Sequence, residues 1–169
     1  RTAPLEQNMP VLLGLIGVWY TNFWQARSQA ILPYDYALEL LPFYLQQLEM
    51  ESNGKRVTRE GEAIDYNTCP VVWGTAGNNG QHAYYQLLHQ GTQLIPADFI
   101  VATQSQAPEY GHQNPVLANA LAQAQALMLG RNEAETREVL GDSLDEAHLS
   151  HRLFPGNQPS NMLMYKTLT

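Results

Sequence analysis

The chain has 169 residues, of which 44% are hydrophobic and 15% charged, and this composition is typical of one globular domain rather than a disordered segment. Its net charge is −7 and no cluster of Lys or Arg interrupts it, which argues against nucleic acids and anionic membranes as partners. An anionic ligand would need local donors that overcome this negative field. Cys69 is the only cysteine, so no internal disulfide forms, which fits a reducing cytoplasm, and we interpret it as a buried thiol.

The N-terminal part predicts a helix, a strand and a second helix. Apolar residues at helical spacing predict a buried helix over residues 10–29, and its longest apolar run is too short to span a bilayer. A short apolar run predicts a buried strand at 30–34. Asp35 is placed to cap the next helix, which we predict over residues 36–50.

The middle of the chain alternates polar and apolar segments. Residues 52–68 are polar and predict a surface loop with a hairpin-like excursion around Gly61. Residues 70–73 predict a second buried strand. A glycine-rich turn over 74–80 follows it and leads into a predicted helix over 81–90.

The C-terminal half begins with a third predicted strand at 98–102. A long Ala- and Leu-rich helix is predicted from residue 114 to 129, where Gly130 ends it. Two short surface helices are predicted at 132–140 and 145–151. Alternating residues then predict a last strand at 161–167.

Strands separated by helices predict a parallel sheet with right-handed crossovers. The fold class is therefore α/β, a three-layer αβα sandwich with a Rossmann-like parallel sheet. Ligands of such sheets bind near the carboxyl ends of the strands, where the turn over residues 74–80 is expected.

Gln47 and Glu51 stand four residues apart at the end of the second predicted helix, on one helix face. Gly54 is predicted to end that helix in a left-handed conformation. A carboxylate held at a helix end suits a base that reaches a substrate from a rigid element. For an isolated Glu, a solvated helix end is the simpler interpretation.

His82 is predicted in the first turn of the helix over 81–90. The positive helix end disfavours an imidazolium, so we expect a neutral ring that donates from one nitrogen and accepts at the other. Considered alone, such a histidine is more often a capping or packing residue. The glycines of the turn are spaced G-x-x-G-x-x-G, which does not match a nucleotide-binding fingerprint. No histidine has metal-ligand spacing, so no metal site is predicted.

Five segments of the sequence resemble the glucose-6-phosphate isomerase family in the family's order: ILPYDY, QLEMESNGK, VVWGTAGNNGQHAYYQLLHQGTQLIPADFI, LANALAQAQALM and FPGNQPSN. They are spread over residues 31–161 of the chain. The resemblance implies that residues 1–169 are a single domain of the sugar-isomerase (SIS) type. Family members are several times longer, so we expect a fragment of the second SIS domain, without the first SIS domain and the C-terminal helical tail. Many relatives carry Glu-Pro where this chain has Thr75-Ala76, which puts the loop's conformation in question.

The resemblance implies an aldose–ketose isomerase that interconverts glucose 6-phosphate and fructose 6-phosphate in glycolysis and gluconeogenesis. Glu51 matches the base that moves a proton through a cis-enediol, Gln47 matches a substrate-binding residue beside it, and His82 matches the residue that assists ring opening. In the family this histidine comes from the neighbouring subunit of a homodimer. No cofactor and no metal are implied, and the compartment is the cytoplasm. Because the family's catalytic Lys and phosphate pocket lie in other segments, we expect the isolated fragment to be inactive.

Two other functions remain open at this stage. One is a non-catalytic SIS domain that binds a sugar phosphate or mediates dimerisation, and the other is a structural scaffold without a ligand. The presence of Glu51, Gln47 and His82 together favours the enzyme.

Overall fold

The computed structural model describes residues 3–168, except for the side chain of Asp142, so the ends of the predicted domain (1–2 and 169) lie outside the described residues. The strands are β1 (Ser28–Pro33), β2 (Val71–Trp73), β3 (Ala97–Ala102) and β4 (Ser160–Tyr165). The α-helices are α1 (Met9–Asn22), α2 (Leu41–Leu45), α3 (Gly77–Ala83), α4 (Tyr85–Gln90), α5 (Gln113–Leu129) and α6 (Glu133–Leu140). Shorter helical segments are η1 (Leu5–Gln7), η2 (Tyr36–Leu38), η3 (Gln46–Glu51), η4 (Pro108–Tyr110), η5 (Gly141–Ser143) and η6 (Glu146–Arg152).

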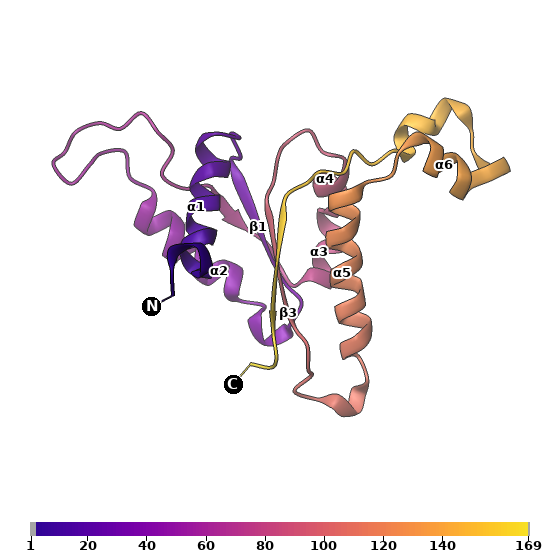
Figure 1. Ribbon diagram of the computed structural model, residues 1–169, viewed down its shortest axis with the longest axis horizontal. Coiled ribbons are helices and arrows are strands. Elements are labelled where there is room, and N and C mark those ends of the chain that lie inside the picture. The colour runs from indigo at the N-terminus through magenta and orange to yellow at the C-terminus, as the bar shows by residue number, and fades with distance from the viewer. Residues whose placement is uncertain (1–2, 169) are drawn as a thin grey trace.

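The four strands form one parallel sheet in the order β2-β1-β3-β4, which confirms the predicted α/β class. The connection after β1 leads to β2 on one side of β1, and the connection after β2 leads to β3 on the other side of β1. Right-handed crossovers in opposite directions place their helices on opposite faces of a sheet. Accordingly, α1 and α2 cover one face, and α3, α4 and α5 cover the other (Figure 1).

The core lies in the two central strands, β1 and β3. Ala30, Leu32, Phe99 and Val101 are fully buried, and Leu32 is paired with Phe99 in the register. Parallel strands covered on both faces are apolar throughout. This is why short continuous apolar runs, without alternation, correctly predicted these strands.

The predicted helix over residues 36–50 is wrong in its continuity, because the structure divides it into η2, α2 and η3. Asp35 does act as a cap, but of the short η2, where its Oδ1 accepts from the Ala37 amide at 3.0 Å. Pro42 stands in the first turn of α2, where a proline lacking its amide hydrogen is tolerated. The last segment, η3, is π-helical, a wider winding that is frequent at functional sites.

The predicted helix over 81–90 begins earlier than expected and is interrupted. Its first part, α3, starts at Gly77 inside the predicted turn, and Tyr84 breaks the helix with φ −146° and ψ 4° before α4 begins. The hairpin-like excursion in the preceding loop is confirmed by the antiparallel bridge between Val57 and Ala63. Cys69 is half-buried, so the prediction of a buried thiol is wrong.

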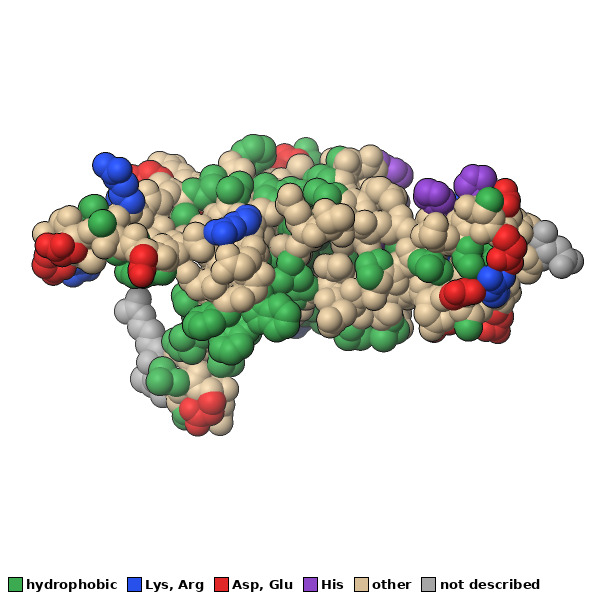
Figure 2. All heavy atoms as spheres, turned by 90° about the horizontal axis from the view of Figure 1, so that it is seen from above, with side chains coloured by type: hydrophobic (Ala, Val, Ile, Leu, Met, Phe, Trp, Pro, Cys, Tyr) green, Lys and Arg blue, Asp and Glu red, His purple; other side chains and the backbone are tan. Residues whose placement is uncertain are grey.

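The prediction that the first helix is buried is also wrong. In α1 only Thr21 is buried, whereas Trp19 and the following Phe23 and Trp24 are 54%, 69% and 60% exposed. Hydrophobic side chains gather on the surface around this helix (Figure 2). The helix is apolar on all sides, and within residues 3–168 the sheet covers only one of them. The periodicity of apolar residues therefore predicted that a helix forms here, but it did not predict that most of its apolar side chains are exposed.

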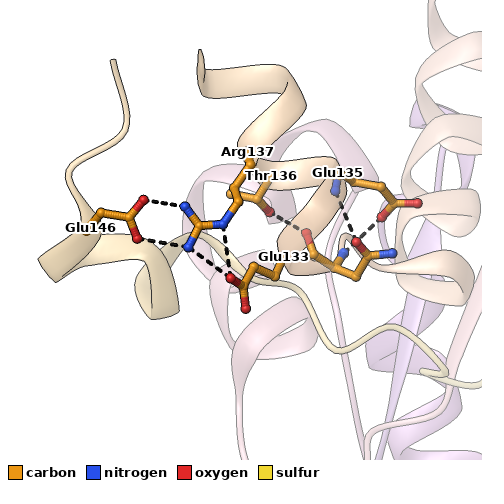
Figure 3. A network of polar contacts seen from close by, with 6 residues as sticks. Glu133, Glu135, Thr136, Arg137 and Glu146 are labelled. Atoms are coloured by element: carbon orange, nitrogen blue, oxygen red, sulfur yellow. Dashed lines mark hydrogen bonds and ion pairs between the residues drawn. The ribbon is translucent and has the colours of Figure 1, made fainter. Parts of the chain in front are cut away.

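Beyond α5, a polar network holds the outer helices together (Figure 3). Asn132 and Glu135 form a capping box at the start of α6. Arg137 donates to Glu133 on its own helix and to both carboxylate oxygens of Glu146 in η6. These ion pairs raise the pKa of Arg137 and lower that of Glu146. Since they are exposed, they align η6 with α6 and contribute little to overall stability.

One carboxyl group lies inside the sheet on the α1 side. Asp98 of β3 accepts from Gln29 of β1 at 2.6 Å and from Asn161 of β4 at 2.8 Å, so it joins three strands. A cavity of about 40 Å³ borders these side chains beneath α1. Burial raises the pKa of the Asp98 carboxyl above its usual value of 3.8, although the two amides act in the opposite direction.

This burial predicts a specific pH dependence of stability. Because the pKa of Asp98 is higher in the folded than in the unfolded chain, folding binds protons between those two values, and Asp98 destabilises the fold as pH rises through them. We expect Asp98→Asn, measured by urea unfolding, to gain free energy of unfolding relative to the parent chain as pH rises from 4 to 7. The exposed Asp65→Asn is the matched control and should show no such gain. A pH-independent difference between parent and Asp98→Asn would contradict this account.

Candidate functional site

The segment η3 is fixed to the sheet through two side chains. Gln46 donates from Nε2 to the carbonyl of Val72 at 3.1 Å, and the Val72 amide donates to Sδ of Met50 at 3.3 Å. Gln47 and Glu51 each follow one of these anchors in sequence, and both are exposed. The predicted pairing of Gln47 and Glu51 on one element therefore has a physical basis, since the residue before each of them is bound to β2.

The end of η3 is closed by local hydrogen bonds. The amide of Gly54 donates to the Met50 carbonyl at 2.9 Å, and Lys55 Nζ donates to the carbonyl of Glu51. Gly54 does not have the predicted left-handed φ. A Cβ there would lie 2.2 Å from the Met50 oxygen, so glycine is required by close approach instead. Among the residues that the structure describes, Ser52 Oγ alone donates to the Glu51 carboxylate, in a long bond of 3.4 Å, and the Glu51 side chain is exposed.

The glycine-rich loop after β2 passes close to β1. Gly74 has φ 149°, and a Cβ there would lie 1.9 Å from the Ile31 carbonyl oxygen. The next residue, Thr75, is bound through both its amide and its hydroxyl to the phenol of Tyr84, at 3.0 and 2.9 Å. Thr75 is thus tied to the break between α3 and α4.

Tyr34, directly after β1, supports the start of α3. A Cβ on Gly77 would lie 2.0 Å from the Tyr34 ring, so the helix rests on the face of that ring. One turn later, Gln81 Nε2 donates to the Tyr34 hydroxyl at 2.8 Å and also contacts Asn119 of α5. The Tyr34 hydroxyl shares a further hydrogen bond of 2.9 Å with that of Tyr85.

Both phenols of this pair are buried. Burial is the largest cause that raises the pKa of Tyr34, and burial together with the Tyr34 hydrogen bond raises the pKa of Tyr85. The two hydroxyl groups therefore stay protonated at neutral pH. They act as a fixed, uncharged link between β1, α3 and α4.

His82 follows Gln81 and is exposed. It lies in the last turn of α3, not in the first turn of a helix, so the prediction that a positive helix end acts on its ring is wrong. The reason is the earlier start of α3 at Gly77. The imidazole at this position is open to solvent.

The structure does not bring His82 to the other two predicted site residues. Gln47 and Glu51 belong to η3, which continues from α2 on the face covered by α1 and α2 (Figure 1). His82 belongs to α3 on the opposite face, with α4 and α5. The sheet therefore lies between the segments that carry Glu51 and His82.

The residues that hold the loop and α3 could not be identified from the sequence: they are Tyr34, Thr75, Gln81, Tyr84 and Tyr85. A tyrosine after a strand and a glutamine before a histidine carry no functional signal in one sequence. Only the contact of Gly77 with a ring explains why a glycine begins the helix.

Two further findings concern residues 3–168. None of the helices described there is long and apolar enough to cross a membrane. Within the same residues, His, Cys, Asp and Glu side chains nowhere gather in a group of three or more that would hold a metal ion.

Comparison with known proteins gives one consistent family. The family model described as phosphoglucose isomerase matches residues 1–169. The glucose-6-phosphate isomerase of Pseudomonas aeruginosa (strain LESB58) is 53% identical over 174 residues, which is 100% of this chain and 31% of that protein. Glucose-6-phosphate isomerase 2 of Chromobacterium violaceum is 55% identical over 172 residues, which is 99% of this chain and 31% of that protein.

Solved structures agree with this result. A glucose-6-phosphate isomerase of Chlamydia trachomatis superposes with a TM-score of 0.83 at 34% identity, covering 98% of this chain and 30% of that one. A hypothetical protein of Thermus thermophilus, 20% identical with a TM-score of 0.59, shares the fold over 96% of this chain. The chain thus spans about a third of the length of the curated relatives it matches. It belongs to the phosphoglucose isomerase family.

Proposed function

We propose that this chain is the part of a glucose-6-phosphate isomerase that carries its proton-transfer base. The substrates are glucose 6-phosphate and fructose 6-phosphate, and the reaction belongs to glycolysis and gluconeogenesis. The observation that carries the proposal is the family match over residues 1–169, which includes an exposed Glu51 on an anchored helix end. In this proposal residues 1–169 form a single SIS-type unit, which corresponds to part of the second SIS domain of the full-length enzyme. The enzyme acts in the cytoplasm without a cofactor.

In this proposal Glu51 is the base. Once the sugar ring is open, the Glu51 carboxylate removes the proton from C2 of the aldose, which gives the cis-enediol in its ionised form. A proton passes from the C2 hydroxyl to O1, and the Glu51 carboxyl returns its proton to C1 to give the ketose. One carboxylate serves both steps when it lies over the C1–C2 edge. The two anchors of η3 on β2 support this role, because a base must keep its position within a fraction of an ångström.

Gln47 and His82 have separate roles. Gln47, one turn before the base on η3, contacts the substrate beside it. His82 assists ring opening, which requires a proton at the ring oxygen and a base for the C1 hydroxyl. An imidazole side chain is able to take part in such proton transfers. The negative net charge of −7 makes donors from other parts of the enzyme necessary for the phosphate.

The opposite placement of Glu51 and His82 supports a homodimer in which each site takes His82 from the partner subunit. A two-fold dimer would then build two equal sites, each with Glu51 from one subunit and His82 from the other. In such a dimer, the exposed side of α3 in one subunit lies against the face that carries η3 in the other.

One prediction concerns the activity of the 169-residue polypeptide alone. The match covers only 31% of the relative's length, so the phosphate pocket and the catalytic Lys implied by the family resemblance belong to other segments. We expect no measurable conversion of fructose 6-phosphate in an assay coupled to oxidation of glucose 6-phosphate. Turnover near the roughly 10 per second of ordinary enzymes would contradict this expectation.

A further prediction concerns the role of Glu51 in a full-length enzyme. We define the chimera as the Pseudomonas aeruginosa isomerase in which the 174 matching residues are replaced by this chain, with residues numbered as here. Glu51→Gln keeps the shape of the side chain but removes its basicity. We expect it to slow isomerisation by roughly 10²–10⁴-fold, the usual contribution of a general base. Exchange of the C2 proton into deuterated water should slow equally.

The matched control is Glu60→Gln, an exposed glutamate of the loop after η3 that should leave turnover unchanged. Exchange between the α and β anomers of glucose 6-phosphate needs ring opening but no C2 proton transfer, so it should persist in Glu51→Gln. If Glu51→Gln isomerises at the parent rate, the base is another residue. That result would favour the alternative of a non-catalytic SIS domain for this part of the chain.

A further inference from the structure

We propose that Gln81 and Tyr34, supported by Tyr85, are positioning residues that hold His82 in place for ring opening. The inference rests on the proposed function and extends it to side chains that do not touch the sugar.

The first step is that His82 has no side-chain support of its own. Within residues 3–168, none of the side-chain hydrogen bonds involves its ring, and the side chain is exposed. Its location therefore depends on the backbone of α3. That helix has only seven residues, which is too short to be stable without tertiary contacts.

The second step is that Gln81 supplies such a contact directly beside His82. Its amide nitrogen donates to the Tyr34 hydroxyl at 2.8 Å and contacts the Oδ1 of Asn119, so both hydrogens of this group are used. Gly77 precedes Gln81 by one turn and rests on the ring of the same tyrosine. Tyr34 therefore holds one face of α3 from its first to its second turn.

The third step is that Tyr34 is itself rigid. It is 6% exposed, its amide donates to the Ile100 carbonyl of β3 at 2.7 Å, and its ring lies 6.0 Å from that of Phe99. Its hydroxyl is bound at 2.9 Å to the hydroxyl of Tyr85, which is 4% exposed. His82 is thus connected to the sheet core through Tyr34, which binds Gln81, and through the peptide bond between Gln81 and His82.

The fourth step is that the other side of α3 is fixed separately. A Cβ on Gly80 would lie 2.5 Å from the Tyr84 hydroxyl, and that hydroxyl binds Thr75 at the start of the loop. With this side held, loss of the Gln81 contact would rotate or shift α3 without unfolding the domain. Small misplacement of a catalytic group is costly, up to roughly 10²-fold for about 1 Å.

The test is a double-mutant cycle in the chimera, with Gln81→Leu, His82→Gln and the pair combined. The readout is enzyme-catalysed exchange between the α and β anomers of glucose 6-phosphate, measured by exchange NMR. We expect Gln81→Leu alone to slow this exchange by about tenfold to 10²-fold with little change in KM. In the His82→Gln background it should cause no further loss, because the group that it positions is already absent.

Controls separate positioning from damage to the fold. Gln86→Leu on α4 changes an exposed glutamine and should leave exchange unchanged. Tyr34→Phe keeps the ring under Gly77 but removes the hydroxyl, so it should give the same non-additive pattern as Gln81→Leu. It also carries the test if Gln81→Leu does not fold, which thermal unfolding of each variant will show.

Two results would overturn the inference in different ways. Equal fold losses from Gln81→Leu in both backgrounds, while His82→Gln alone slows exchange, would mean that Gln81 acts on structure in general; only the positioning role then fails. An unchanged exchange rate in His82→Gln would remove the ring-opening role of His82 under the proposed function, and the positioning role with it.

Discussion

The pairing of β1 with a neighbour on each side determines on which face of the sheet each candidate site residue lies. Because β2 and β3 flank β1, the two crossovers that join them run in opposite directions and occupy opposite faces of the sheet. The segment with Gln47 and Glu51 lies in the first crossover, from β1 to β2, and the helix with His82 lies in the second, from β2 to β3. Their separation is thus a consequence of strand order and handedness, not of local sequence.

The candidate site combines exposed side chains with backbone segments that are bound to the sheet. Glu51 and His82 are both exposed, yet the residues beside them are bound to the sheet: Met50 to the amide of Val72, and Gln81 to Tyr34 at the end of β1. Such an arrangement leaves the two candidate side chains accessible while their neighbours hold the backbone. The segments that carry them are short, a π-helical segment and a seven-residue helix.

The first three strands could be predicted from the sequence because buried parallel strands are short apolar runs, whereas the last was predicted from the alternation of its residues. All four lie where residues 30–34, 70–73, 98–102 and 161–167 indicate, within a few residues. Strand order could not be predicted, since an apolar run does not specify its neighbour, and so the separation of Glu51 from His82 was not foreseen from the pattern alone.

The helices were predicted less well for physical reasons that particular residues show. Periodicity over residues 36–50 does not reveal that Pro42 starts a new helix or that the last turns widen. The start of α3 depends on the Tyr34 ring, a contact across 43 positions from Gly77 that no local pattern encodes. Likewise, α1 reads as a buried helix because it is apolar, whereas its exposure depends on what else packs against it.

The central claim is that a working site takes Glu51 from one subunit and His82 from its partner. The most direct test is to co-express the Glu51→Gln and His82→Gln forms of the chimera and to measure isomerisation. Random assortment gives mixed dimers in about half of the population, each with one intact site, so activity should return to about a quarter of the parent value. If the mixed dimers, isolated with two affinity tags, are as inactive as either variant alone, Glu51 and His82 act from the same chain and the account is wrong.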